Sequence, residues 1–269
     1  MEQIDFVTAG GHRLEYRWIP GERGRPVLVF LHQGLGSVSM WRDFPDVLAA
    51  RTGCPALIYS RYGHGRSDVV AEPRRPDFMV VEGREVLPEI LAALGVKDTI
   101  LVGHSDGATI ALNCLVTGAG TARAAIVVAP HVLDEETIRR SVEELREGWG
   151  REELRERLAR HHRDADRTFL SWAQVWLLPG MRGWTMEPEL RAIHCPVLAI
   201  QGVEDTLGTM IHIDTIARVS GGPVQIEKLE DCGHDPFRER PERMIALCTE
   251  FVGRFSAPHT RRRGAGSTP

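Results

Sequence analysis

One stretch, LVGHSDGAT at residues 101–109, constrains the fold more than any other part of the 269-residue chain. An apolar run leads into GHSDG at 103–107, and an apolar helical pattern continues over 108–115. The pattern predicts a strand, a tight turn with Ser105 at its apex, and a helix. A serine hydroxyl is a poor nucleophile unless such a turn exposes its oxygen to a base. Gly-Ser-Gly clusters also occur as plain turns, so the strand-to-helix context is what favours a nucleophile.

Composition narrows the class of protein. With 42% hydrophobic and 26% charged residues, the chain can build one large core or a core with a lid. A protein that binds nucleic acid usually has an excess of basic residues, whereas this chain has a formal net charge of -4. We therefore expect a small-molecule partner and no nucleic acid. A homodimer is left open as the assembly of the chain.

No segment of the sequence has the pattern of a signal peptide or a bilayer-spanning helix. The first residues include acidic side chains, and no stretch approaches the roughly 20 apolar residues that cross a membrane. The five cysteines are scattered without metal-ligand spacing, which fits reduced thiols. We therefore expect a cytoplasmic protein with no membrane partner.

Strand and helix patterns alternate along the chain. Residues 3–19 alternate apolar and polar side chains around two glycines, which predicts a hairpin at a sheet edge. Further strands are predicted at 27–31, 56–59, 99–102, 124–128, 196–202 and 224–229, and helices at 41–51, 82–94, 209–220 and 239–255. Pro88 could kink the second helix. The alternation predicts a parallel sheet with right-handed crossovers.

The pattern changes at Leu133. Residues 134–167 are rich in Glu and Arg, with sparse apolar positions at helical spacing, and residues 169–184 include Trp172, Trp176 and Trp184. Ordinary helix packing accounts for some of these tryptophans. An aromatic surplus outside the main sheet also suits a lid that lines a pocket, so we expect the three tryptophans to bind substrate. We assign residues 133–193 to this lid, 1–132 and 194–257 to the core, and 258–269 to a disordered tail.

Three loops that each follow an apolar strand contain Ser105, Asp205 and His234, in that order. His234 is expected to take the proton of the Ser105 hydroxyl and return it to the leaving group, while Asp205 orients the imidazole. Glu204 is an alternative acid, but Asp205 fits the G-x-x-D spacing from Gly202 better.

The chain resembles the α/β-hydrolase superfamily over nearly its whole length up to the tail. The motifs that support the resemblance are LHQGLGS, YSRYGHGRSD, GHSDG, QGVED and DCGHDPF. The resemblance implies the α/β-hydrolase fold, a mostly parallel central sheet flanked by helices, with a helical cap at 133–193 after the sixth strand. It also implies an oxyanion hole made by the backbone N–H groups of Gly34 and Asp106, with Gln33 beside them on the substrate side.

Three residues depart from the family pattern. Gln33 replaces a usual glycine, Ser60 a frequent aspartate, and Asp106 a usually uncharged residue. An ionised Asp106 about 6 Å from the oxyanion would oppose the intermediate by roughly 3 kcal/mol at an effective dielectric constant of about 20. Its side chain could turn toward the first turn of the helix, or face the pocket and meet a cation such as Arg61 or a substrate amine.

The remaining histidines and cysteines are interpreted as structural. His32 and His104 are expected to pack at strand ends, and Cys232 to be a packing residue. The side chains of the adjacent His161 and His162 diverge, so we expect no metal, and no cofactor is implied.

The favoured function is hydrolysis of a small-molecule ester through an acyl-enzyme on Ser105. Two alternatives stay open. One is C–C bond hydrolysis of the meta-cleavage-product type, which the chain also resembles, and the other is a non-enzymatic receptor for a small ligand.

Overall fold

The computed structural model describes residues 4–118, 121–150 and 152–257, so the predicted tail at 258–269 lies outside the described residues. One sheet of eight strands forms the centre, in the order β1-β2-β4-β3-β5-β6-β7-β8. β2 is antiparallel to β1 and β4, and the other neighbouring pairs are parallel. The strands are β1 Ile4–Ala9, β2 His12–Ile19, β3 Val27–Leu31, β4 Ala56–Tyr59, β5 Asp98–His104, β6 Thr121–Val128, β7 Val197–Gly202 and β8 Val224–Leu229. The parallel sheet and the edge hairpin are confirmed.

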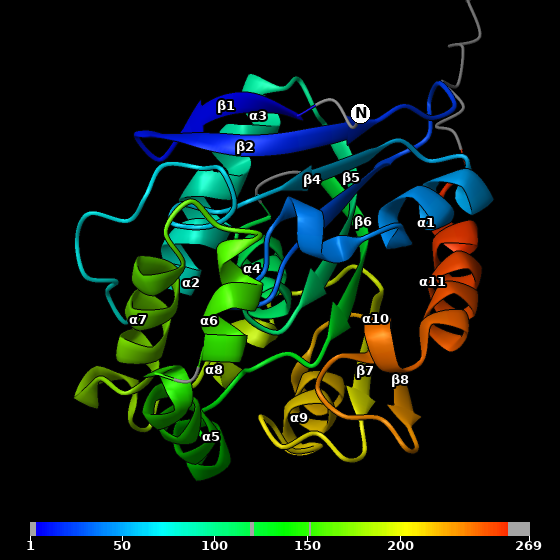
Figure 1. The fold of residues 1–269 in the computed structure, drawn as a ribbon. Helices are drawn as coiled ribbons and strands as arrows, with labels where there is room; N and C mark the ends of the chain where they lie inside the picture. Colours follow the sequence, from blue (N-terminus) through cyan, green and yellow to red (C-terminus); the bar gives the residue numbers. More distant parts are fainter. Residues whose placement is uncertain (1–3, 119–120, 151, 258–269) are drawn as a thin grey trace, which may run out of the picture.

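Helices cover both faces of this sheet because the central strands are apolar on both sides. Leu101 of β5 packs into one core with α4 (Asp106–Val116), while Ile100 and Val102 point into a second core with α11 (Pro241–Phe255). α1 (Phe44–Thr52) lies beside α11 on that second face (Figure 1). α3 (Leu87–Ala93) and α9 (Ile211–Val219) contribute to the first core. This layered arrangement is the predicted α/β-hydrolase fold.

Several helices begin or end at other residues than predicted, at prolines or at a residue with a positive φ angle. The helix predicted at 82–94 begins earlier, as α2 (Phe78–Val81), and passes through a π-helical turn, η2 (Glu82–Val86), into α3. Pro88 is the second residue of α3, one residue after that turn, where its missing N–H is tolerated. The predicted helix at 239–255 is split into α10 (Pro236–Glu239) and α11, which starts at Pro241. The helix predicted at 41–51 is interrupted at Arg42, whose φ of 53° separates η1 (Val38–Trp41) from α1.

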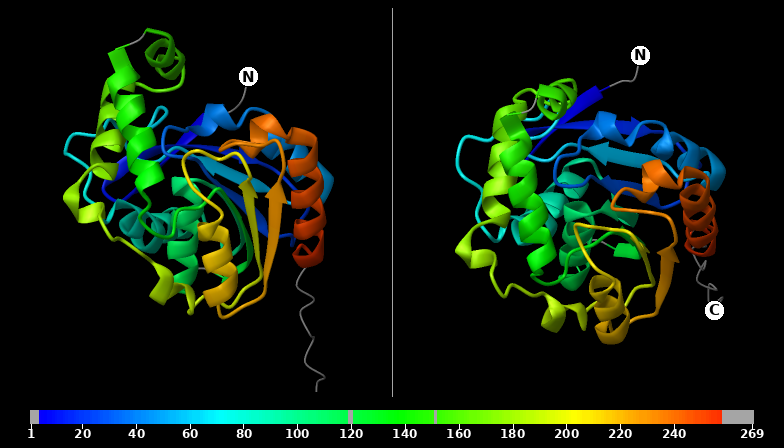
Figure 2. Two further views of the ribbon diagram at one scale, coloured as in Figure 1. Left: turned by 90° about the horizontal axis from the view of Figure 1, so that it is seen from below. Right: turned by 60° about the horizontal axis from the view of Figure 1, so that its bottom comes forward.

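The segment between β6 and β7 holds α5 (Glu136–Glu147), η3 (Gly148–Gly150), α6 (Glu152–Ala159), α7 (Ala165–Trp176), η4 (Pro179–Met181) and α8 (Glu187–Leu190). α5, α6 and α7 lie together beyond the carboxyl ends of the strands, apart from the sheet (Figure 2). α8 instead packs against α9 and α4 of the core. A search of the described helices finds none that is long and apolar enough to cross a membrane.

Candidate active site

Ser105 lies at the turn between β5 and α4, in a backbone conformation that an L residue rarely adopts. Its φ and ψ angles are 54° and -121°. The flanking glycines make this turn possible, since a Cβ on Gly103 would come within 2.5 Å of the Gly107 carbonyl oxygen, and a Cβ on Gly107 would overlap the Leu31 carbonyl. The predicted strand, serine turn and helix are therefore confirmed.

A continuous chain of hydrogen bonds joins the three predicted residues. His234 Nε2 lies 3.0 Å from Ser105 Oγ, and His234 Nδ1 lies 2.8 Å from Asp205 Oδ2. Asp205 is held by the Leu207 N–H, which donates to its other oxygen at 2.7 Å, and by the Gln201 amide, which donates at 2.6 Å. Glu204, the alternative acid, is exposed. The structure thus brings Ser105, Asp205 and His234 together, with Asp205 in the position of the acid.

A second imidazole also reaches the Ser105 hydroxyl. His131, just after β6, places Nε2 at 3.3 Å from Ser105 Oγ, and its ring lies nearly parallel to that of His234, with centroids 5.8 Å apart. Burial holds its pKa well below the ordinary value, helped by the neighbouring His212 and His234, so the ring is neutral. Sequence analysis did not identify His131. Its position at the carboxyl end of a central strand is the one signal that could have found it.

Loop 32–36, which follows β3, has its carbonyl groups tied to the protein behind it. Arg61 donates to the carbonyls of His32 and Gln33, His64 Nε2 donates to the Gly34 carbonyl at 2.8 Å, and His162 Nε2 donates to the Leu35 carbonyl at 3.1 Å. Such bonds fix the orientation of each peptide unit.

The predicted oxyanion donors are the backbone N–H groups of Gly34 and Asp106. Within the described residues, the Gly34 N–H donates to no backbone or side-chain acceptor. Asp106 is the first residue of α4, so its N–H has no acceptor within the helix. Gly34 also lies directly against the Trp172 indole, because a Cβ there would overlap Nε1. Two free N–H groups beside a serine oxygen could stabilise negative charge that develops there.

The structure shows the surroundings of the three residues that depart from the family pattern. Ser60 Oγ donates to the buried Glu15 carboxylate at 2.8 Å and accepts from the Val38 N–H, so a carboxylate still lies beside this position. Gln33 lines the cavity beside the serine.

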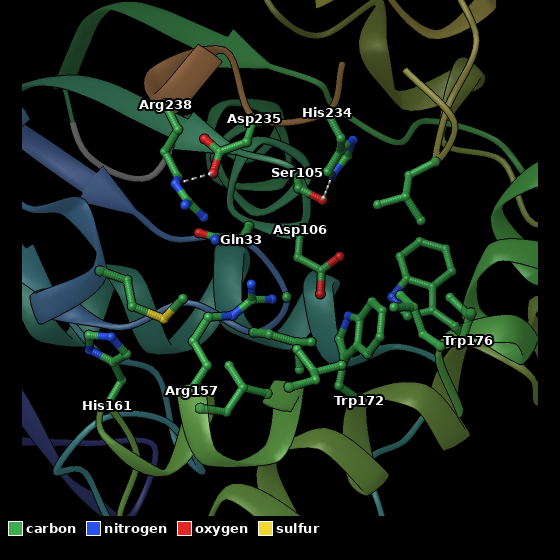
Figure 3. A pocket seen from close by; sticks show the side chains of 18 of the residues that line it. Gln33, Ser105, Asp106, Arg157, His161, Trp172, Trp176, His234, Asp235 and Arg238 are labelled. Atoms are coloured by element: carbon green, nitrogen blue, oxygen red, sulfur yellow. Dashed lines mark hydrogen bonds and ion pairs between the residues drawn. The ribbon is translucent and has the colours of Figure 1, made fainter. Parts of the chain in front are cut away.

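Asp106 also faces the cavity. It is 1% exposed, and its Oδ2 has no hydrogen-bond partner in the part of the chain that the structure describes. Burial raises its pKa, while the charges of Arg61 and Arg74 act in the opposite direction. Of the two orientations considered, the structure shows the one toward the pocket (Figure 3).

A cavity of about 430 Å³ opens beside Ser105, His234 and Asp106. Its wall is mostly apolar, and most of the apolar side chains come from α5, α6 and α7, among them Ile138, Leu145, Leu154, Trp172 and Trp176. Trp184, predicted to bind substrate, is not among the residues that line this cavity. It is partly buried against the main core, and its carbonyl accepts from the Asp134 N–H at 2.7 Å. An aromatic surplus alone did not distinguish lining from packing.

The residues interpreted as structural have structural partners. His104 Nε2 donates to the His234 carbonyl at 2.7 Å, and His32 Nε2 accepts from the Arg61 N–H at 3.1 Å. His161 bonds Ser39 Oγ, whereas His162 points to loop 32–36. Cys232 is fully buried, which raises its pKa to about 11.

Comparison with known proteins agrees with this geometry. Residues 28–247 match the alpha/beta hydrolase family. A curated relative, the sn-1-specific diacylglycerol lipase ABHD11 of Mus musculus, is 31% identical over 99 residues, which make up 37% of this chain and 31% of that protein. The match thus spans about a third of that relative's length.

Solved structures share the fold over nearly the whole chain. A membrane phospholipase A described as a bacterial virulence factor has a TM-score of 0.75 at 18% identity, covering 93% of this chain and 86% of that one. Carboxylesterase CesB from Bacillus subtilis has a TM-score of 0.70 at 20% identity, covering 94% and 92%. With the matched residues, the fold and the motifs taken together, the chain belongs to the alpha/beta hydrolase family.

Proposed function

We propose that the protein is a serine hydrolase that cleaves a small-molecule carboxylic ester through an acyl-enzyme on Ser105. The observation that supports this most directly is the hydrogen-bonded chain from Asp205 through His234 to Ser105, at 2.8 and 3.0 Å, beside a largely apolar cavity. The lipase and carboxylesterase names of the similar proteins agree with this substrate class.

In the acylation step, His234 Nε2 takes the Ser105 proton while Oγ attacks the ester carbonyl carbon. The carbonyl oxygen becomes an oxyanion, which the N–H groups of Gly34 and Asp106 stabilise. When the tetrahedral intermediate collapses, the bond to the alcohol breaks and His234 returns the proton to the leaving oxygen. Asp205 keeps Nδ1 protonated, so that Nε2 faces the serine throughout.

In the second half of the reaction, a water molecule replaces the alcohol. His234 takes a proton from this water, whose oxygen attacks the acyl carbon, and then returns the proton to Ser105 Oγ as the carboxylic acid leaves. Each proton taken by His234 is thus given back within the same half-reaction. The same residues could act on a C–C bond, so the choice of substrate decides between the two chemistries.

Active-site labelling and a substrate panel test the proposal. A fluorophosphonate probe should label the wild type and lose its label in Ser105→Ala. Ser220→Ala should label normally, since Ser220 Oγ forms no hydrogen bond to any residue that the structure describes. p-Nitrophenyl esters of graded chain length should be turned over, and a meta-cleavage dienoate should not. Unchanged labelling of Ser105→Ala would place the nucleophile elsewhere, and faster turnover of the dienoate would select C–C hydrolysis. Binding without any turnover would select a receptor.

Variants of the other two residues check their roles. His234→Ala and Asp205→Asn should each lower kcat by several orders of magnitude, because the three residues act as a unit. Glu204→Gln is the matched control, since this neighbouring carboxylate is exposed. A larger loss for Glu204→Gln than for Asp205→Asn would contradict the assignment of the acid.

A further inference from the structure

Arginines gather around the cavity although the chain as a whole is acidic. The chain has 33 basic and 37 acidic residues, yet the cavity is lined by Arg42, Arg157, Arg160 and Arg238, against the carboxylates of Asp106 and Asp235 among the described residues. The arginines come from separate places in the fold: after η1, on and just after α6, and in α10. Their convergence is therefore a property of the tertiary structure and not of one charged helix.

Three of these guanidinium groups have no partner within the described part of the chain. Among the described residues, Arg42, Arg157 and Arg160 form no ion pair or side-chain hydrogen bond, while Arg238 lies 4.0 Å from Asp235. Arg155, elsewhere on α6, is by contrast paired with Asp166. Unpaired arginines beside a cavity are available to a ligand.

The charges of Arg42 and Arg160 act on the same neighbouring side chain. Burial lowers the pKa of His161, and the positive charges of Arg160 and Arg42 lower it further. His161 itself lines the cavity. Both arginines thus contribute positive potential at one position on the cavity wall.

The cavity has two chemically different sides, as Figure 3 shows. Arg157 and Arg238 extend from opposite walls toward Gln33, and His161 lies on the same side. Trp172 and Trp176 form the other side, beyond Asp106. A ligand that reaches Ser105 therefore has cationic groups on one side and aromatic rings on the other.

We propose that the cationic side binds an anionic group of the substrate, so that the ester cleaved at Ser105 also carries a carboxylate or a phosphate. This inference rests on the proposed esterase function. Guanidinium groups donate two parallel hydrogen bonds to either anion, and several arginines from separate elements can enclose one such group. The apolar part of the same substrate contacts the tryptophans on the other side.

A matched pair of substrates tests the charge directly. Mono-4-nitrophenyl glutarate has a free carboxylate, and its methyl ester has the same acyl chain and leaving group without the charge. The wild type should have the higher kcat/KM for the charged ester, and the preference should fall as salt is added. The measured quantity is the ratio of the two kcat/KM values, because a general loss of activity cancels in it.

Arginine variants should change that ratio. Arg42→Gln, Arg157→Gln and Arg160→Gln should each lower it roughly two- to fivefold, and the triple variant by about tenfold or more, as expected for exposed ion pairs. Arg146→Gln is the control, because Arg146 is exposed on α5 outside the cavity lining. A ratio that stays the same in the triple variant, or a wild type that prefers the neutral ester, would overturn the proposal.

Two further arms separate the remaining possibilities. A short-chain acylglycerol 3-phosphate compared with the matched acylglycerol shows whether phosphate or carboxylate gives the larger ratio, and either preference supports the anion site. If neither ester is hydrolysed, the proposed function fails independently. Calorimetric binding of the charged ester to Ser105→Ala, with and without the triple arginine change, then still tests the anion site: equal affinity for both proteins overturns it.

Discussion

Lowering the pH from 7.5 to 5.5 should destabilise the folded chain, because several histidines of the site are buried in their neutral form. Burial holds the pKa values of His32, His64 and His131 well below the ordinary value, and that of His162 at about 4. Two of these rings also donate to carbonyls of loop 32–36. In the unfolded chain each imidazole takes up a proton at about pH 6.5.

The sign of the effect follows from the proton count. Below pH 6.5 the unfolded chain binds more protons than the folded one, so the free energy of unfolding falls as the pH falls. Between pH 7.5 and 5.5 each such histidine contributes a loss of about 1.4 kcal/mol, and four contribute about 5 kcal/mol. Burial raises the pKa values of Asp106 and Glu82, which opposes part of this loss. The net loss should be about 3 to 5 kcal/mol, a large share of the roughly 5 to 15 kcal/mol typical of a folded protein.

Urea unfolding at pH 7.5, 6.5 and 5.5 and constant ionic strength measures this loss. His162→Asn should reduce the drop by about 1.4 kcal/mol, because Asn can still accept the Gly65 N–H that now bonds Nδ1. His194→Asn should leave the drop unchanged, since His194 is exposed. A total loss below about 1 kcal/mol, or a His162→Asn protein that retains the full loss, would refute the reasoning.

The other predictions concern the cavity. Asp106→Asn should move the acidic limb of the kcat/KM profile to lower pH, because burial raises the pKa of the Asp106 carboxyl and the variant removes this titrating group from the cavity; an unshifted limb would count against this. His131→Phe should lower kcat roughly tenfold through loss of one hydrogen bond, with partial recovery in His131→Gln; equal kcat values for wild type and Phe variant would show that the contact is passive. Trp176→Ala should raise KM for long-chain esters more than for acetate, whereas Trp184→Ala, outside the cavity, should not change this preference.

The strands were predictable because burial on both faces selects uninterrupted apolar runs, as at 27–31 and 56–59. The ends of the strands were harder to predict than the strands themselves. β6 begins at Thr121 instead of 124, through pairing with β5, and Arg123 within it forms an ion pair with Asp98. From sequence alone, a charged residue such as Arg123 predicts a loop, because its ion-pair partner on the neighbouring strand is not known.

The predicted residues of the hydrogen-bonded chain were found from the sequence because each follows a strand and belongs to a motif. His131 and the cavity arginines belong to no motif, and each stands alone among dissimilar neighbours. Their position near Ser105 depends on how β6, η1, α6 and α10 are placed relative to one another. Sequence spacing contains no information on that placement, so these residues could be identified only in the folded chain.

The structure also indicates how an acidic side chain can be tolerated directly after the serine. A negative charge at Asp106 would oppose an oxyanion by roughly 3 kcal/mol, but the buried Arg61 and the partly buried Arg74 lie close enough to lower its pKa. Glu82 is buried in the same group, and each of its two arginine neighbours lowers its pKa while burial raises it. Two cations thus balance two acids behind loop 32–36. Since Arg61 also donates to the carbonyls of His32 and Gln33, the group that offsets the charge of Asp106 is the same one that orients the loop. Charge compensation at Asp106 and the orientation of loop 32–36 therefore both depend on Arg61, and a change at Arg61 should affect both together.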